Sequence, residues 1–279
     1  MSSAGGDPRD LLVRARSALL DVLGALSSQR DAVVVIGAQA VYLWTGGLEV
    51  ALAEATKDSD VALDPRALVD DPTLDAAMKS AGFFPAASGN PGAWVNAEGI
   101  PVDLMVPEDL AGPGNKQTRG ARIPPHSKTA TRRARGLEAA VVDYRVLPVA
   151  ALDAADFREI PAKVAGPAAL LVAKVHKIVE RMDSPHRLND KDAHDIYRLL
   201  RAIDTTELSE AFRGLLAAEL CSEVTREALD ALGKHFATGP DATGSAMAGR
   251  AEEGVGDPEQ VSVATALLAQ DLMDSLGRY

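Results

Sequence analysis

The chain has 279 residues, of which 47% are hydrophobic and 25% charged, so it is long enough for two domains with buried cores. Its net charge of −11 argues against a protein that coats nucleic acid through its overall charge. The single cysteine excludes an intrachain disulfide and a zinc site built from cysteines. Charged residues interrupt every apolar run before residue 30, and no later run is long enough to cross a bilayer. We therefore expect no signal peptide, no membrane contact and a cytoplasmic location.

Helices and strands alternate along the first half of the predicted structure. Apolar residues at helical spacing indicate helices, and short runs of β-branched or alternating residues indicate strands. We expect helices over 8–27, 38–44 and 72–81, and strands over 33–36, 58–63, 94–96 and 100–106. The last two strands are separated by a short turn and are expected to form a hairpin.

A segment rich in proline, glycine and basic residues, 107–136, predicts a long loop before a strand at 140–148. Its basic residues are Lys116, Arg119, Arg122, Lys128, Arg132, Arg133 and Arg135. Two interpretations of this basic run stay open: a solvated loop, or a contact with substrate phosphates.

The second half of the chain is predicted to be helical. Helices are expected over 167–182, 189–202, 206–219, 221–237 and 258–277. Residues 239–257 are rich in small and acidic residues and predict a mobile linker. The expected fold class is α/β (α+β). A small mixed sheet with helices occupies 1–155, and a helical C-terminal domain occupies 156–279.

Three aspartates fall on predicted strands. Asp58 and Asp60 are separated by one residue, so both side chains point to the same face of a strand. Two carboxylates on one face repel each other unless a cation lies between them, and Mg²⁺ takes one or two carboxylates plus phosphate oxygens. Asp103 joins the pair if its own strand is a neighbour. The three acids would then hold two Mg²⁺ ions for an in-line phosphoryl displacement, although such acid spacing is also common on exposed strand faces.

The helix predicted over 167–182 carries a cationic stripe. Lys174, Lys177 and Arg181 lie apart from the apolar stripe of this helix, in an arrangement that suits a triphosphate. Asp192 falls in the apolar stripe of the next helix, where an unpaired carboxylate is unfavourable. We therefore expect it to pair with Lys174. The pair is open to two interpretations, a structural link between two helices and part of a catalytic site.

These motifs resemble those of a known family. The segments 33–43 (VVVIGAQAVYL) and 55–63 (ATKDSDVAL) are similar to the small-residue turn and the Thr-x-Asp-x-Asp strand of the polymerase-β-like nucleotidyltransferase superfamily. Within it, the chain resembles the AbiEii-type nucleotidyltransferases, the toxins of type IV toxin–antitoxin systems. Residues 174–181 and 191–200 resemble the family's Lys-x(6)-Arg and Lys/Arg-Asp-x-x-Asp helices. Ala38 stands where many members have Gly or Ser, which removes a potential hydroxyl ligand.

The resemblance implies a transferase that moves an NMP from an NTP to an acceptor hydroxyl. It implies that Mg²⁺ is held by Asp58, Asp60 and Asp103, the last of which also accepts the proton. The further catalytic residues it implies are Lys174, Asp192 and Asp195, and which of these two aspartates is functional stays open. The nucleotide-binding residues it implies are Gly37, Ala38, Lys174, Lys177 and Arg181.

The acceptor and partners follow from the resemblance and from charge. An RNA or tRNA end is the favoured acceptor, supported by the basic run and opposed by the acidic net charge. A small-molecule hydroxyl, as in antibiotic-modifying relatives, is the alternative. The resemblance also implies a possible antitoxin protein as partner. A non-catalytic relative that binds a nucleotide or a partner is a further alternative.

Overall fold

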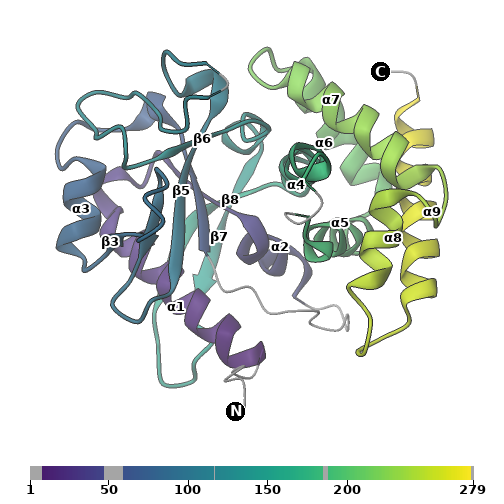
Figure 1. Ribbon diagram of the computed structural model, residues 1–279, viewed down its shortest axis with the longest axis horizontal. Coiled ribbons are helices and arrows are strands. Elements are labelled where there is room, and N and C mark those ends of the chain that lie inside the picture. The colour runs from purple at the N-terminus through teal and green to yellow at the C-terminus, as the bar shows by residue number, and fades with distance from the viewer. Residues whose placement is uncertain (1–7, 47–58, 116, 185–187, 278–279) are drawn as a thin grey trace. The chain divides into compact units, whose positions relative to one another are not determined.

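The computed structural model describes residues 8–46, 59–115, 117–184 and 188–277 (Figure 1). The chain forms two compact units, each described here by itself. Unit 1 comprises Met1–Gln39, Ala55–Ala134 and Arg145–Val164, and unit 2 comprises Ala40–Glu54, Arg135–Tyr144 and Ala165–Tyr279. The mixed α/β class with a helical C-terminal part is confirmed. No helix within the described ranges has both the length and the apolar character to cross a membrane.

A mixed sheet is the centre of unit 1. Its strands within the described residues are β1 (Val33–Ile36), β2 (Ser59–Leu63), β3 (Phe84–Pro85), β4 (Ala93–Val95), β5 (Pro101–Pro107), β6 (Arg132–Ala134), β7 (Tyr144–Ala150) and β8 (Glu159–Ala165). They are ordered β3-β4-β5-β2-β1-β8-β7, and β6 pairs with β5 away from this path. Strand β2 pairs antiparallel with β1 and parallel with β5. The predicted hairpin is confirmed, because β4 and β5 pair antiparallel.

One face of this sheet is covered by α1 (Pro8–Ala25), which packs against β2 and β5. Helix α1 also contacts α3 (Leu74–Ser80). The Ser59 hydroxyl on β2 donates a 2.7 Å hydrogen bond to the Ala15 carbonyl of α1. Val61 and Leu104 are fully buried. Because side chains alternate along a strand, Asp60 and Asp103 lie on the opposite face of the sheet from Ser59.

Unit 2 is a helical assembly. Its helices within the described ranges are α4 (Pro167–Met182), α5 (Asp190–Ala202), α6 (Thr205–Ala217), α7 (Ser222–Leu232), α8 (Thr243–Arg250) and α9 (Pro258–Leu276). Helix α4 packs against α5 and α7, and α5 packs against α8 and α9. Helix α2 (Gly37–Thr45) has its first residues in unit 1 and the rest in unit 2.

Each unit contains one tryptophan, and both indoles are hydrogen-bonded. Trp94 of unit 1 is buried, and its Nε1 donates to the Ala130 carbonyl at 3.0 Å. Trp44 of unit 2 is half-buried, and its Nε1 donates to the Ala165 carbonyl at 2.8 Å. Each indole is therefore held by a hydrogen bond within its own unit.

Four strands and one helix differ from the prediction. Strands β3, β6 and β8 were not predicted, and the strand expected at 140–148 lies at Tyr144–Ala150. The mobile linker predicted at 239–257 is wrong, because α8 lies within it and Met247 is fully buried. A Cβ on Gly244 would collide with the Phe236 ring, so the small residues here permit close helix packing.

Replacing Gly244 by alanine should therefore lower the free energy of unfolding by about 1–3 kcal/mol, because the added methyl group must displace the Phe236 ring. Urea denaturation measures this change. Gly214 on α6 is the matched control, since nothing lies within 4 Å of a Cβ added there. Gly214→Ala should keep or raise stability by up to about 1 kcal/mol. Equal losses in both variants would contradict the close packing of α8.

Candidate functional site

Two aspartates lie side by side on adjacent strands of unit 1. Asp60 on β2 is the register partner of Asp103 on β5, and Ile36 on β1 is the other partner of Asp60. Neighbouring strands lie about 4.8 Å apart, so the two side chains project from adjacent positions on one face. Both are partly exposed. The predicted convergence of Asp103 with Asp60 is confirmed, and we call these residues the acid pair.

Helix α2 begins beside the acid pair. Its first residue, Gly37, has a positive φ of 68°, and a Cβ at this position would collide with Asp60 Oδ2. Glycine is therefore required both for the backbone conformation and for the approach of the carboxylate. The next residue, Ala38, is buried. Backbone N–H groups in the first turn of a helix have no partner within the helix and favour negative charge, so the positions of Gly37 and Ala38 suit an anion.

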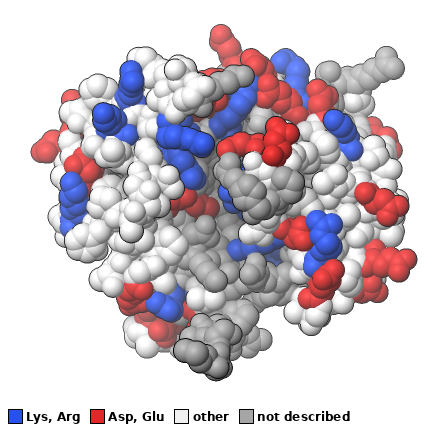
Figure 2. Space-filling model, viewed as in Figure 1, with Lys and Arg blue, Asp and Glu red and all other residues white. Residues whose placement is uncertain are grey.

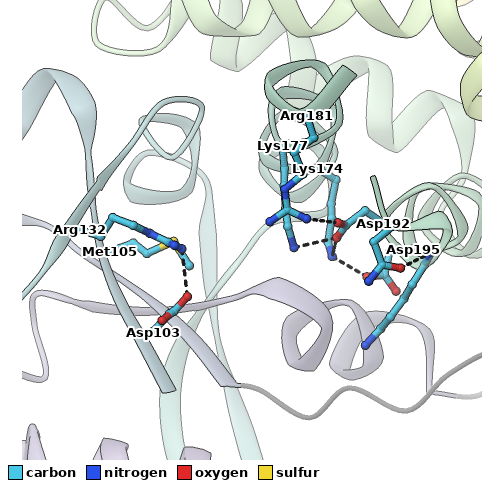
Figure 3. Close-up of polar contacts among 10 residues, drawn as sticks. Asp103, Met105, Arg132, Lys174, Lys177, Arg181, Asp192 and Asp195 are labelled. Atoms are coloured by element: carbon cyan, nitrogen blue, oxygen red, sulfur yellow. Dashed lines mark hydrogen bonds and ion pairs between the residues drawn. The ribbon is translucent and has the colours of Figure 1, made fainter. Parts of the chain in front are cut away.

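An arginine contacts the acid pair. Arg132 on β6 donates from Nη2 to Asp103 Oδ2 at 3.0 Å and to Met105 Sδ at 3.3 Å (Figure 3). Strand β6 pairs parallel with β5, and Met105 is the register partner of Arg132. A guanidinium thus lies against one of two adjacent carboxylates and reduces their mutual repulsion.

The third predicted acid, Asp58, lies outside the described residues. Among the residues that the structure does describe, no three His, Cys, Asp or Glu side chains form a group that could hold a metal ion. The described part of the predicted metal site therefore consists of Asp60 and Asp103.

The second predicted site lies within unit 2, where α4 and α5 pack together. Lys174 Nζ is 2.9 Å from Asp192 Oδ1 and 2.5 Å from Asp195 Oδ2 (Figure 3). Lys177 Nζ is 2.9 Å from Asp192 Oδ1, and Arg181 Nη1 is 3.3 Å from Asp192 Oδ2. The expected pairing of Asp192 with Lys174 is confirmed. We call these five residues the charged cluster.

The five residues of the charged cluster fall into a buried group and a partly exposed group. The side chains of Lys174, Asp192 and Asp195 are 7%, 5% and 2% exposed, whereas those of Lys177 and Arg181 are 37% and 26% exposed. All three cations of the predicted stripe converge on Asp192. Lys174 is enclosed by two carboxylates, so its charge is already neutralised within the unit.

The protonation states of the charged cluster follow from these contacts. Burial lowers the pKa of Lys174, but the charges of Asp192 and Asp195 outweigh this and hold it above its ordinary value. Burial raises the pKa of Asp192, but the charges of Lys174 and Lys177 outweigh this and hold it well below its ordinary value. The lysine is therefore a cation and Asp192 an anion at neutral pH.

Further polar side chains of α2 and α5 contact one another within unit 2 and were not predicted. Arg198 lies over the Tyr42 ring, 5.1 Å from its centroid, and donates to Thr45 Oγ1 at 3.3 Å. Burial, with the charge of Asp195, raises the pKa of the Tyr42 hydroxyl to about 12. The sequence signal that could have identified Arg198 is its position three residues after Asp195, on the same side of α5.

Some arginines of the basic run form hydrogen bonds or ion pairs with other residues of this protein. Arg133 donates to the Gly112 carbonyl at 2.8 Å, Arg135 pairs with Glu223 and Glu227, and Arg132 pairs with Asp103. The remaining described cations, Arg119, Arg122 and Lys128, are exposed. Basic and acidic side chains are interspersed over the face that Figure 2 shows. Lys116 lies outside the described residues.

The lone cysteine is structural. Cys221 is fully buried, and burial raises the pKa of its thiol to about 11. A buried thiol with a raised pKa is a poor nucleophile, so Cys221 is not a candidate catalytic residue.

Comparison with known proteins identifies one related family. A family model described as Nucleotidyltransferase matches residues 14–219. No curated protein and no solved structure matches the chain. The matched residues contain both the acid pair and the charged cluster.

Proposed function

This chain belongs to the nucleotidyltransferase family, and from that membership we propose that it transfers an NMP from an NTP to an acceptor hydroxyl and releases pyrophosphate in a Mg²⁺-dependent reaction. The observation that carries the proposal is the acid pair. Two carboxylates lie in register on adjacent strands, beside the glycine that begins α2. This arrangement supports a site for a triphosphate and its counter-ion.

The acid pair fits Mg²⁺ because carboxylate oxygens are the ligands that this ion prefers. Asp60 and Asp103, together with Asp58, would hold two ions. When bound, Mg²⁺ neutralises charge that develops on the phosphoryl oxygens. Asp103 would accept the proton of the acceptor hydroxyl, as a carboxylate within hydrogen-bond reach can do. The backbone N–H groups of Gly37 and Ala38 would donate to phosphate oxygens.

The charged cluster is proposed to serve two roles. Its more exposed cations, Lys177 and Arg181, are proposed phosphate contacts because each can turn from Asp192 to a ligand without leaving a buried charge unpaired. Lys174, Asp192 and Asp195 would hold α4 and α5 together and fix the direction of those two cations. Burial of Lys174 supports this positioning role over direct contact with substrate.

The acceptor is proposed to be an RNA or tRNA end. Exposed Arg119, Arg122 and Lys128 support this choice, because cations on one segment attract a phosphate backbone. The resemblance to AbiEii-type enzymes supports a toxin role with an antitoxin partner. A small-molecule hydroxyl is the alternative acceptor.

A non-catalytic nucleotide-binding relative is the second candidate. The observation that favours it is the ion pair between Arg132 and Asp103, because a guanidinium against this carboxylate can substitute for a metal ion.

The deciding experiment incubates the protein with Mg²⁺ and each of the four α-³²P-labelled NTPs in turn, with either total RNA or a set of small-molecule hydroxyl compounds as acceptor. We expect one or more NTPs to label RNA, with pyrophosphate released in equal amount. Binding of an NTP without transfer to RNA or to any small-molecule hydroxyl would support the second candidate. Labelling of hydroxyl compounds but not RNA would favour the small-molecule acceptor.

A further inference from the structure

Arg132 is fixed through its backbone and partly free at its side chain. Its strand lies between β5 and Gly120, with which Arg132 forms an antiparallel bridge. The next residue, Arg133, donates its backbone N–H to the Arg119 carbonyl at 2.9 Å. The Arg132 side chain is 35% exposed. The guanidinium can therefore change its partner while the strand keeps its place.

The partner of Arg132 in this structure is a carboxylate proposed to bind metal. Its Nη2 lies 3.0 Å from Asp103 Oδ2, a distance typical of a charge-assisted hydrogen bond. A divalent cation that binds Asp103 would meet the positive guanidinium within a few ångströms. Two cations at this spacing repel each other, so cation and arginine compete for the carboxylate.

We propose that Arg132 is an exchangeable counter-ion: it holds Asp103 while the site has no divalent cation, and it moves to the triphosphate when cation and nucleotide bind. This inference rests on the proposed function, because it requires a cation at Asp103. A phosphate coordinated to the same cation as Asp103 comes within reach of the guanidinium. The negatively charged phosphates of the nucleotide then pair with Arg132 in place of Asp103.

The exchange couples the two ligands. Without nucleotide, the Asp103 ion pair opposes cation binding, and without cation the same pair withdraws Arg132 from phosphate. Each ligand removes the obstacle to the other, so their binding is positively cooperative. An ion pair that served stability alone would not link the two affinities.

The test measures two affinities in the full-length protein. Mn²⁺ binding without nucleotide is followed by electron paramagnetic resonance, and binding of inorganic tripolyphosphate in the presence of saturating Mn²⁺ is followed by calorimetry. Arg132→Gln should bind Mn²⁺ about three- to five-fold more tightly than the wild type, the range expected for loss of a partly exposed ion pair. The same variant should bind tripolyphosphate about three- to five-fold more weakly.

Arg66→Gln is the matched control, because it removes the same charge from another partly exposed Arg–Asp ion pair of unit 1, in which Arg66 Nη2 lies 2.8 Å from Asp64 Oδ2. It should change each affinity less than twofold. Arg132→Lys keeps the charge and should give Mn²⁺ affinity between those of wild type and Arg132→Gln, which provides a second variant if the glutamine form unfolds.

The outcomes separate the inference from the proposed function. If Mn²⁺ binds and Arg132→Gln matches Arg66→Gln in both affinities, the exchange is wrong and the metal site stands. If tripolyphosphate binds neither wild type nor any variant, or binds Arg132→Gln as tightly as wild type, the proposed move of Arg132 to the triphosphate is wrong. If neither wild type nor any variant binds Mn²⁺ and no NTP is transferred, both proposals fail.

Discussion

Asp60→Asn should lower nucleotidyl transfer by about a thousandfold or more while the protein stays folded. Asparagine keeps the size of the side chain beside Gly37 but removes the negative charge that would hold Mg²⁺. Folding should be unaffected or slightly favoured, because Asp60 and Asp103 are like charges on adjacent strands. The rate is measured by NTP labelling of the acceptor, and folding by circular dichroism and urea denaturation.

The control for this result is Asp75→Asn on α3 in the same unit. Asp75 forms an i,i+4 pair with exposed Lys79 and lies outside the acid pair. Its replacement should change transfer less than twofold. A rate for Asp60→Asn near that of the wild type would contradict the assignment of Asp60 as a metal ligand.

Lys174→Met should destabilise the protein by about 3–5 kcal/mol. Methionine fills a similar volume but leaves Asp195, whose side chain is 2% exposed, without the ammonium group that lies 2.5 Å away. Lys177 also pairs with Asp192, but its side chain is 37% exposed. Lys177→Met should therefore lower the free energy of unfolding by less than about 1 kcal/mol. Urea denaturation of both variants measures the difference. Similar losses in the two would contradict the buried position of Lys174.

The pH dependence of the Lys174 effect distinguishes lost charge from lost packing. The pKa of Asp192 is depressed in the folded state, so its stabilisation is present above the ordinary value of 3.8 and is lost as pH falls through the lower folded value. The pKa of Lys174 is raised, so its stabilisation is present below the ordinary value of 10.5. The stability difference between wild type and Lys174→Met should therefore shrink below about pH 3.8. A constant difference would indicate packing.

Most elements could be predicted because their patterns are local. The run Val33–Ile36 and the helical stripe of α4 are visible in consecutive residues. Strand β8 could not be found this way, since Pro161 and Lys163 interrupt it and it is completed by parallel pairing with β1, far away in the sequence. Helix α8 was hidden because its glycines indicate flexibility in sequence. In the structure Gly244 packs against the Phe236 ring and Gly249 against Ser262 of α9, which the pattern within 239–257 does not show.

The candidate site was predictable to a similar degree. Alternation along a strand placed Asp60 on one face, and the helical period placed Asp192 where a buried partner was needed. The role of Arg132 could not be predicted, because β6 is three residues long and its contact with Asp103 arises from strand pairing. Long-range pairing is the information that local pattern lacks.

The placement of the two indole side chains gives each unit its own optical reporter. Trp94 is enclosed in unit 1 and Trp44 is partly accessible in unit 2, and the chain has no other tryptophan. A Trp44→Phe protein therefore fluoresces from the first unit alone, and a Trp94→Phe protein from the second alone. Denaturation followed in the two single-tryptophan proteins would reveal whether the units melt together or in sequence.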